Sequence, residues 1–295
     1  SSCEVGQCKY VLLTDEHGGV INDPILLKLA EDRFWLSIAD SDVLLWAKGV
    51  AVHSEMDVKI CEPDVSPLQL QGPQSRDILR ASFGDAPAEL NYYRFLQFDW
   101  DGVPLIISRT GWSSELGYEI FLCDGRKGDA LWEYIMETGK PFGLMPGHTS
   151  SIRRIEAAML SYNADVTLDD NPYELGMERL VDCDTDVAFI GKKSLQDIRS
   201  KGVSRKFVGL EIFGDPFFGS NDARWATYMN GKRVAYVTSA ILSSRLNKSV
   251  GLAMVAEKMS ALGTELEVDD RVLTRKCVVV QKPFYGPQKT LAING

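Results

Sequence analysis

The stretch SRTGWSSELGYEIFLC, residues 108–123, constrains the fold of this chain more than any other feature. Apolar and β-branched residues lead into it and predict a buried strand over Val103–Ser108. Gly111 and Gly117 bracket a turn, and the extended pattern then resumes over Tyr118–Cys123. The sequence therefore predicts two consecutive strands joined by a short, glycine-bounded loop.

Glu119 has an unusual place in the second of these strands. Side chains alternate along a strand, so Glu119 is expected to share a face with Phe121 and Cys123. An ionised carboxylate on an apolar face is costly unless it is hydrogen-bonded or functional. The alternative is a face that is only half covered, on which Glu119 reaches water.

Composition limits the size, location and partners of the protein. A chain of 295 residues can hold two or three domains, and 45% hydrophobic with 25% charged residues is ordinary for a soluble protein. No apolar run is long enough to span a bilayer and no signal segment opens the chain, so we expect no membrane partner. The expected location is the cytoplasm, or the mitochondrial matrix in a eukaryote. The net charge of -9 argues against a nucleic-acid partner, which needs clustered Lys and Arg.

Cysteine and histidine usage argues against a metal site. The six cysteines include no C-x-x-C pair, so neither a zinc site nor a disulfide framework is expected, and reduced thiols fit better. The three histidines are widely spaced and add nothing to a metal site. We therefore predict no bound metal.

The order of the predicted elements indicates an α+β protein with antiparallel sheets and flanking helices, followed by a β-barrel or jelly-roll-like module. We expect residues 1–61 to begin a first α+β domain and residues 62–147 to form a second. Residues 148–203 are expected to return to the first domain and to end in a linker. Residues 204–295, in which short strands recur, are expected to form the C-terminal barrel.

Four shorter patterns carry local predictions. Asp40-Ser41 is a plausible N-cap for the helix that follows it. Val58–Cys61 and Phe142–Met145 read as short strands. A helix is predicted from Thr149 to Tyr162.

RTGWSSELGYEI resembles the R-T-G-[YW]-[TS]-[GS]-E-x-G-Y-E-I signature of the glycine-cleavage T-protein family of folate-dependent aminomethyltransferases and demethylases. The segments LQLQGP, RIEAAM and TSAILSSRL resemble further motifs of that family, in the family's order. The resemblance implies the T-protein fold, with a C-terminal barrel, and tetrahydrofolate as the one-carbon acceptor.

The resemblance assigns three residues to the pterin ring of tetrahydrofolate. Glu119 is implied as the pterin anchor, since a carboxylate can accept hydrogen bonds from the pterin amino and ring N–H groups side by side. Trp112 is implied as an aromatic residue that packs on the ring. Tyr10 matches a family aromatic beside the pterin, although by pattern alone it is equally an ordinary strand tyrosine.

An arginine is implied near the benzoyl-glutamate end of the folate. In the register of RIEAAM against the family's R-L-E-A-G-M, that arginine is Arg154. Arginine binds a carboxylate well because its guanidinium offers two parallel donors. The alternative for this segment is a solvated pair between Arg153 and Glu156, three residues apart on a helix.

The segment GGVIND departs from the family pattern. The resembling aminomethyltransferases carry G-G-x-x-D-D, and the first aspartate is held to be essential for moving the aminomethyl carbon. Here that position is Asn22, followed by Asp23. An amide cannot take a proton or balance a positive charge as a carboxylate can. We take Asn22 and Asp23 as the catalytic candidates, positioning the substrate and folate N5; as an alternative or in addition, Asn22 is a turn residue.

The predicted function is tetrahydrofolate-dependent methyl transfer or demethylation, from a small sulfonium, ammonium or methoxy donor to folate N5. GGVIND followed by Pro24, together with LSIADSD at residues 36–42, resembles the branch of the family that contains the dimethylsulfoniopropionate demethylases. One alternative is a glycine-cleavage-type aminomethyltransferase that forms 5,10-methylenetetrahydrofolate with a lipoyl carrier protein. A second is a non-catalytic folate-binding protein of the iron–sulfur repair type, whose K-G-C-x-x-G-Q-E motif is not present in the sequence.

The resemblance also implies a substantial segment before the strand at Tyr10, which these residues do not include. In the family that segment helps to wall the folate and substrate pocket. We therefore expect part of the substrate recognition to lie outside these 295 residues.

Overall fold

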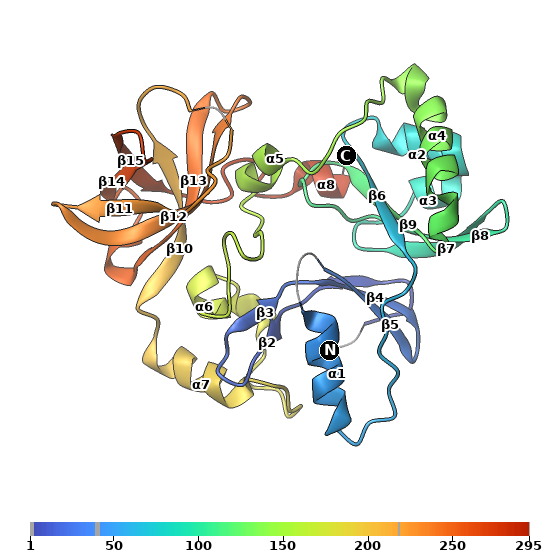
Figure 1. The fold of residues 1–295 in the computed structure, drawn as a ribbon, viewed down its shortest axis with the longest axis horizontal. Coiled ribbons are helices and arrows are strands. Elements are labelled where there is room, and N and C mark those ends of the chain that lie inside the picture. The colour runs from blue at the N-terminus through green and yellow to red at the C-terminus, as the bar shows by residue number, and fades with distance from the viewer. Residues whose placement is uncertain (1–2, 39–41, 218, 295) are drawn as a thin grey trace. The chain divides into compact units, whose positions relative to one another are not determined.

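The computed structural model describes residues 3–38, 42–217 and 219–294. The chain divides into two compact units, and each is described by itself (Figure 1). Unit 1 consists of residues 1–10, 24–149 and 288–295, and unit 2 of residues 11–23 and 150–287. Neither unit is continuous in sequence, because the chain leaves unit 1 after Tyr10 and returns to it at Pro24.

Unit 1 is built on a four-stranded antiparallel sheet in the order β6-β9-β8-β7. Its strands are β6 Ser66–Gln71, β7 Phe95–Trp100, β8 Val103–Ser108 and β9 Gly117–Leu122. Helices α2 Ser75–Phe83 and α4 Gly128–Gly139 pack on one face. They cover it because the apolar residues of each strand alternate toward them, among them Leu105 and Ile107 of β8.

A second sheet lies against the other face of the first. It is three-stranded, in the order β1-β4-β5, with β1 Cys8–Tyr10, β4 Ile25–Ala30 and β5 Arg33–Ser37. Ile106 and Phe121 from the first sheet join Cys8 and Leu27 from the second in one buried cluster. The remaining helices of unit 1 are α1 Val43–Val52, α3 Asp85–Ala88 and α8 Thr290–Asn294, with short 3-10 turns at Gly125–Lys127 and Lys140–Phe142.

Unit 2 contains a closed six-stranded barrel in the order β10-β13-β12-β11-β14-β15. The strands are β10 Arg205–Ile212, β11 Trp225–Met229, β12 Lys232–Ser243, β13 Lys248–Ala256, β14 Glu265–Asp269 and β15 Thr274–Val280. The rest of unit 2 comprises β2 Leu13–Thr14, β3 Val20–Asn22, α5 Ser151–Glu156, α6 Pro172–Leu175 and α7 Lys192–Lys201, with 3-10 turns at Glu178–Leu180 and Glu257–Met259. The predicted fold, antiparallel sheets with flanking helices followed by a barrel, is confirmed.

Several local predictions were wrong. Residues 58–61 form no strand in the described part of the chain, because no neighbouring strand pairs with them. Pro141, which has no N–H for a ladder, and Gly143, with a φ of 74°, turn the predicted strand at 142–145 into a 3-10 turn and a loop. The helix predicted to reach Tyr162 ends at Glu156, since Ala158 takes a left-handed φ of 52°. The proposed cap at Asp40-Ser41 lies outside the described residues.

One barrel strand, β11, was not predicted from the sequence. Its five residues become a strand only by pairing with β12 on one side and β14 on the other, which closes the barrel. The predicted domain boundaries at residues 147 and 203 lie near the end of the long unit 1 segment and the start of β10, whereas residue 61 falls inside unit 1. None of the helices among the described residues is both long and apolar enough to cross a membrane.

The barrel interior holds one polar side chain whose removal should stabilise it. Thr227 of β11 is fully buried, and its hydroxyl has no hydrogen-bond partner among the described residues. An unsatisfied buried hydroxyl costs about 1–3 kcal/mol, so we expect Thr227→Val to raise the free energy of unfolding by about 1 kcal/mol. Urea titration of both proteins measures the change, and a variant less stable than the parent would contradict this account of the barrel interior.

Candidate functional site

Glu119 lies near the start of β9, a middle strand of the unit 1 sheet. Gln69 of β6 stands directly opposite it on one side, and Ser108 of β8 stands opposite it on the other. The predicted alternation holds, since Tyr118 and Ile120 face the helices while Phe121 joins the cluster on the opposite face. The sheet register therefore surrounds one carboxylate with two polar side chains.

The Glu119 carboxylate accepts hydrogen bonds from two neighbouring side chains. Gln69 Nε2 donates to Oε1 at 3.1 Å, and the Thr110 hydroxyl donates to Oε2 at 2.5 Å. Burial raises the pKa of the Glu119 carboxyl, while these two hydrogen bonds from Thr110 and Gln69 act to lower it. The expected apolar setting was only half right: Phe121 lies on the same face, but the immediate neighbours of Glu119 are polar.

The sequence prediction missed Gln69, Ser108 and Thr110. Gln69 and Ser108 could have been considered, because antiparallel strands place residues of the same face opposite one another and both lie in predicted strands. The register that brings Gln69 and Ser108 to Glu119 depends on how β6 and β8 pair with β9, which the pattern of one strand does not specify.

Gln71 joins the two resembling motifs LQLQGP and RTGWSSELGYEI in space. Its amide nitrogen donates to the Tyr118 carbonyl at 3.3 Å, and its amide oxygen accepts from the Ser113 hydroxyl at 2.5 Å. A Cβ on Gly111 would stand 2.5 Å from the same amide group, and one on Gly117 would also overlap it. A side chain at either glycine would push the Gln71 amide away from its hydrogen bonds to Tyr118 and Ser113.

Tyr10 and Trp112 also belong to unit 1. Tyr10 ends β1 and, by strand alternation, lies on the same face as Cys8, which packs against Phe121. Burial, and next the Glu119 carboxylate, raise the pKa of Cys8 to about 12, which places this face of β1 near Glu119. Trp112 is half-buried in the loop between β8 and β9. Their assignment to the pterin stays a prediction.

Asn22 and Asp23 belong to unit 2, at the end of β3. Asn22 is 2% exposed, and its Oδ1 accepts the backbone N–H of Asp23 at 2.9 Å. Asn22 is the last residue of β3, and this bond is made where the chain leaves the strand. Asp23 is half-buried, and burial followed by the Asp23 carboxylate raises the pKa of Tyr162.

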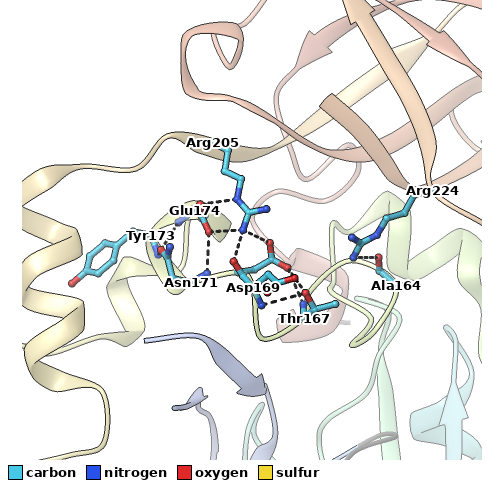
Figure 2. A network of polar contacts seen from close by, with 9 residues as sticks. Ala164, Thr167, Asp169, Asn171, Tyr173, Glu174, Arg205 and Arg224 are labelled. Atoms are coloured by element: carbon cyan, nitrogen blue, oxygen red, sulfur yellow. Dashed lines mark hydrogen bonds and ion pairs between the residues drawn. The ribbon is translucent and has the colours of Figure 1, made fainter. Parts of the chain in front are cut away.

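A polar network holds β3 in place within unit 2. The backbone N–H of Val20 donates to the Asp170 carbonyl at 2.9 Å. Figure 2 shows Arg205 of β10 reaching from the barrel to the neighbouring segment, where its Nε donates to Glu174 at 2.8 Å and its Nη2 to the Asp169 carbonyl. Asn171 and Glu174 form a capping box at the start of α6. The barrel therefore fixes the strand that carries Asn22.

Arg154 lies within unit 2 at the contact between α5 and the barrel. Its Nη1 donates to Asp165, and its Nη2 donates to the Ser239 hydroxyl at 2.8 Å. The side chains of Arg154 and Asp165 are 7% and 0% exposed. The role of Arg154 at the folate tail stays a prediction, and its contacts in the structure are those of a buried ion pair.

The alternative predicted for the same segment is present. Arg153 pairs with Glu156 at 2.8 Å on one turn of α5, but Glu156 is buried rather than solvated. Arg245, an exposed residue, lies 3.9 Å from the same carboxylate, and its guanidinium carbon lies 4.0 Å from the centre of the Tyr285 ring.

The candidate sites hold no cluster of metal-binding side chains. Within residues 3–38, 42–217 and 219–294, no group of three His, Cys, Asp or Glu residues could hold a metal ion. All six cysteines are free thiols, and Cys8, Cys183 and Cys277 are buried.

We expect the pair of Arg154 and Asp165 to contribute strongly to stability. Arg154→Met would leave the Asp165 carboxylate buried without its cation, and breaking one side of a buried pair costs about 3–5 kcal/mol. The control is Lys193→Met, which removes an exposed pair with Asp197 and should cost under about 1 kcal/mol. Equal unfolding free energies for the two variants in urea would show that the buried pair has no structural role.

Comparisons with known proteins agree with this fold. The GCVT N-terminal domain model matches residues 1–185, and the glycine cleavage T-protein C-terminal barrel domain model matches residues 205–286. The chain is 36% identical over 263 residues to the dimethylsulfoniopropionate demethylase of Ruegeria pomeroyi, covering 89% of this chain and 71% of that protein. It is 31% identical over 295 residues to an aminomethyltransferase of Bacillus mycoides, covering 98% of this chain and 79% of that protein.

A solved structure extends this agreement to the fold. The glycine cleavage system aminomethyltransferase T from Bartonella henselae matches with a TM-score of 0.82 at 25% identity, covering 97% of this chain and 77% of that one. The predicted family is confirmed, because two family models match in order and the relatives align over most of their length. This chain belongs to the glycine cleavage T-protein family.

Proposed function

We propose that this protein moves a methyl group from a small cationic donor, a sulfonium or a quaternary ammonium, to N5 of tetrahydrofolate. Family membership supports the coarser part, a folate-dependent one-carbon transferase with tetrahydrofolate as the acceptor. The finer part, a methyl group and an onium donor, is supported by the residues at the end of β3.

The observation that carries the proposal is the amide at Asn22. Its Oδ1 accepts the Asp23 N–H, so the other end of the amide is Nδ2, which can only donate. A carboxylate at this position could take a proton or balance a developing positive charge, as aminomethyl transfer requires. A buried amide can do neither. Asn22 therefore favours a reaction in which no proton has to be taken at this point.

Displacement of a methyl group from an onium donor is such a reaction. The C–S or C–N bond breaks with its electron pair on the leaving atom, which departs neutral and needs no acid. The new N5–C bond leaves N5 as an ammonium that still carries its proton, and this proton is released to water after the transfer step. A methoxy donor fits less well, because its leaving oxygen would require a proton. The enzyme then chiefly has to align the donor with the acceptor nitrogen, and Asp23 is the carboxylate next to Asn22 that could hold the donor's positive charge.

The hydrogen bonds made by Glu119 support its proposed role as the acceptor for the pterin N–H groups. Each carboxylate oxygen accepts one hydrogen bond from the protein, from Gln69 or Thr110, and an ionised carboxylate has about four acceptor positions. Each oxygen thus has an acceptor position left for a further donor. Two neighbouring N–H groups of the pterin could donate to these two positions. Tetrahydrofolate bound there would supply the nucleophilic nitrogen, and Glu119 would hold and orient it.

The second candidate function is aminomethyl transfer. Its support is the similarity to an aminomethyltransferase over 98% of this chain, and a lipoyl carrier protein would then be the partner. A non-catalytic folate-binding role is the remaining alternative. The two candidate reactions give different folate products, so product analysis separates them.

The proposal is tested by mass spectrometry of the folate after incubation with tetrahydrofolate and single donors. The panel contains sulfonium, betaine and methoxy compounds, with an aminomethyl-loaded lipoyl carrier as a separate arm. Formation of 5-methyltetrahydrofolate from an onium donor supports the proposal. Formation of 5,10-methylenetetrahydrofolate from the carrier alone overturns it, and bound but unchanged folate in every arm leaves a binding role.

Glu119→Ala should weaken tetrahydrofolate binding by about 2–4 kcal/mol, because the pterin donors would be left without their acceptor. Isothermal titration calorimetry measures the affinity. Glu115→Ala, a change at a loop carboxylate of the same signature, serves as the comparison and should have a smaller effect. Unchanged affinity in the Glu119 variant would rule out the anchor role.

Asn22→Asp should not be needed for methyl transfer. We expect the unaltered protein to form 5-methyltetrahydrofolate from its onium donor. The variant should be no faster, because the transfer step itself needs no base at this position. Initial rates with the same donor give the comparison. Activity that appeared only in the variant would show that the assigned reaction class is wrong.

A further inference from the structure

We propose that Thr110, supported by Ser108, positions the Glu119 carboxylate and holds it as a hydrogen-bond acceptor for its ligand. This inference rests on the proposed folate-binding role of Glu119, which it extends to two residues with no assigned function. Both are positioning residues, because they act on the ligand through Glu119.

The three side chains form a continuous chain of hydrogen bonds. The Thr110 hydroxyl lies 2.5 Å from Glu119 Oε2, and the Ser108 hydroxyl lies 2.5 Å from the Thr110 hydroxyl. Ser108 is 0% exposed and Thr110 is 4% exposed, so water does not compete for these bonds. Gln69, the other donor to Glu119, is exposed, and its bond competes with water. Thr110 is therefore the donor that fixes the carboxylate.

The donor and acceptor of each hydrogen bond in this series follow from the number of protons available. A hydroxyl has one proton to donate, and an ionised carboxylate can only accept. When Glu119 is ionised, Thr110 must donate to it, and the Thr110 oxygen is then free to accept from Ser108. Each hydroxyl polarises the next in the same sense, which strengthens the terminal bond. The arrangement thus favours the charged form of Glu119, the form that accepts from pterin N–H groups.

The effect on pH dependence has a definite sign. Burial raises the pKa of Glu119 and the Thr110 hydrogen bond lowers it, so removing this bond moves the pKa further upward. Ligand binding that requires the ionised form is lost as pH falls through this pKa. Without the Thr110 hydroxyl, that loss begins at a higher pH.

Few other groups near Glu119 can account for such a shift. Gln69 and Ser108, opposite it on β6 and β8, do not ionise. Cys8 on β1, whose pKa is raised to about 12 by burial and by Glu119, stays neutral through the acid range. Arg94, which acts on Cys8, forms an ion pair with Glu4 at 2.7 Å.

The test compares Thr110→Val, which removes the hydroxyl, with Thr110→Ser, which keeps it. Calorimetry of tetrahydrofolate binding from pH 5 to 8 should show about 10-fold weaker binding for the valine variant at neutral pH. The pH at which the valine variant loses binding on acidification, the acid limb of its binding curve, should rise by about one unit. The serine variant should restore both values. Thr227→Val, which removes a buried hydroxyl from the barrel, is the matched control and should change neither.

A second measurement needs no folate. The pKa of Glu119, followed by carbon NMR of the labelled side chain, should rise in Thr110→Val and return in Thr110→Ser. An unchanged Glu119 pKa, or a uniform loss of affinity with an unmoved acid limb, overturns the positioning role. Failure of the unaltered protein to bind tetrahydrofolate would instead overturn the proposed function, while the NMR result would still decide the relation between Thr110 and Glu119.

Discussion

A carboxylate in a middle strand of a sheet must receive hydrogen bonds from its neighbours, and much of unit 1 is arranged around that requirement. Glu119 can be accommodated because the register of β6 and β8 brings a polar side chain opposite it on each side. The loop that follows β8 brings Thr110 to the same carboxylate. The loop itself is held by Gln71, whose amide fills the space beside two glycines. The signature therefore describes a local structure as much as a binding residue.

Unit 2 also contains buried carboxylates, and arginine side chains pair with them. Asp165 receives Arg154 from α5 and the hydroxyls of Thr238 and Ser239 from β12, so one carboxylate ties the helix to the barrel. Arg205 does the same for α6, through Glu174, and for the segment that precedes it, through the Asp169 carbonyl. Buried charges of this kind are retained only where all partners are present, because a lone charge is far more costly than none. Both networks stabilise the frame that carries Asn22.

The position of Asn22 connects this frame with the reaction. Family membership alone leaves aminomethyl transfer and demethylation open, since the relatives include both an aminomethyltransferase and a demethylase. The difference lies in one functional group: a carboxylate can take a proton and balance a positive charge, whereas the neutral amide of Asn22 can do neither. This difference in one functional group is the basis of the proposed reaction class.

The sequence by itself determined the family, the antiparallel fold with its barrel and the position of Glu119 on a strand, because these depend on short patterns of alternation, turn residues and motif order. Only the tertiary structure decided the setting of Glu119, the burial of Arg154 and the existence of β11. Each depends on residues far apart in the chain: Gln69 lies 50 residues from Glu119, and Ser239 lies 85 from Arg154. A local pattern says which way a side chain points, whereas the register between elements decides what it meets there.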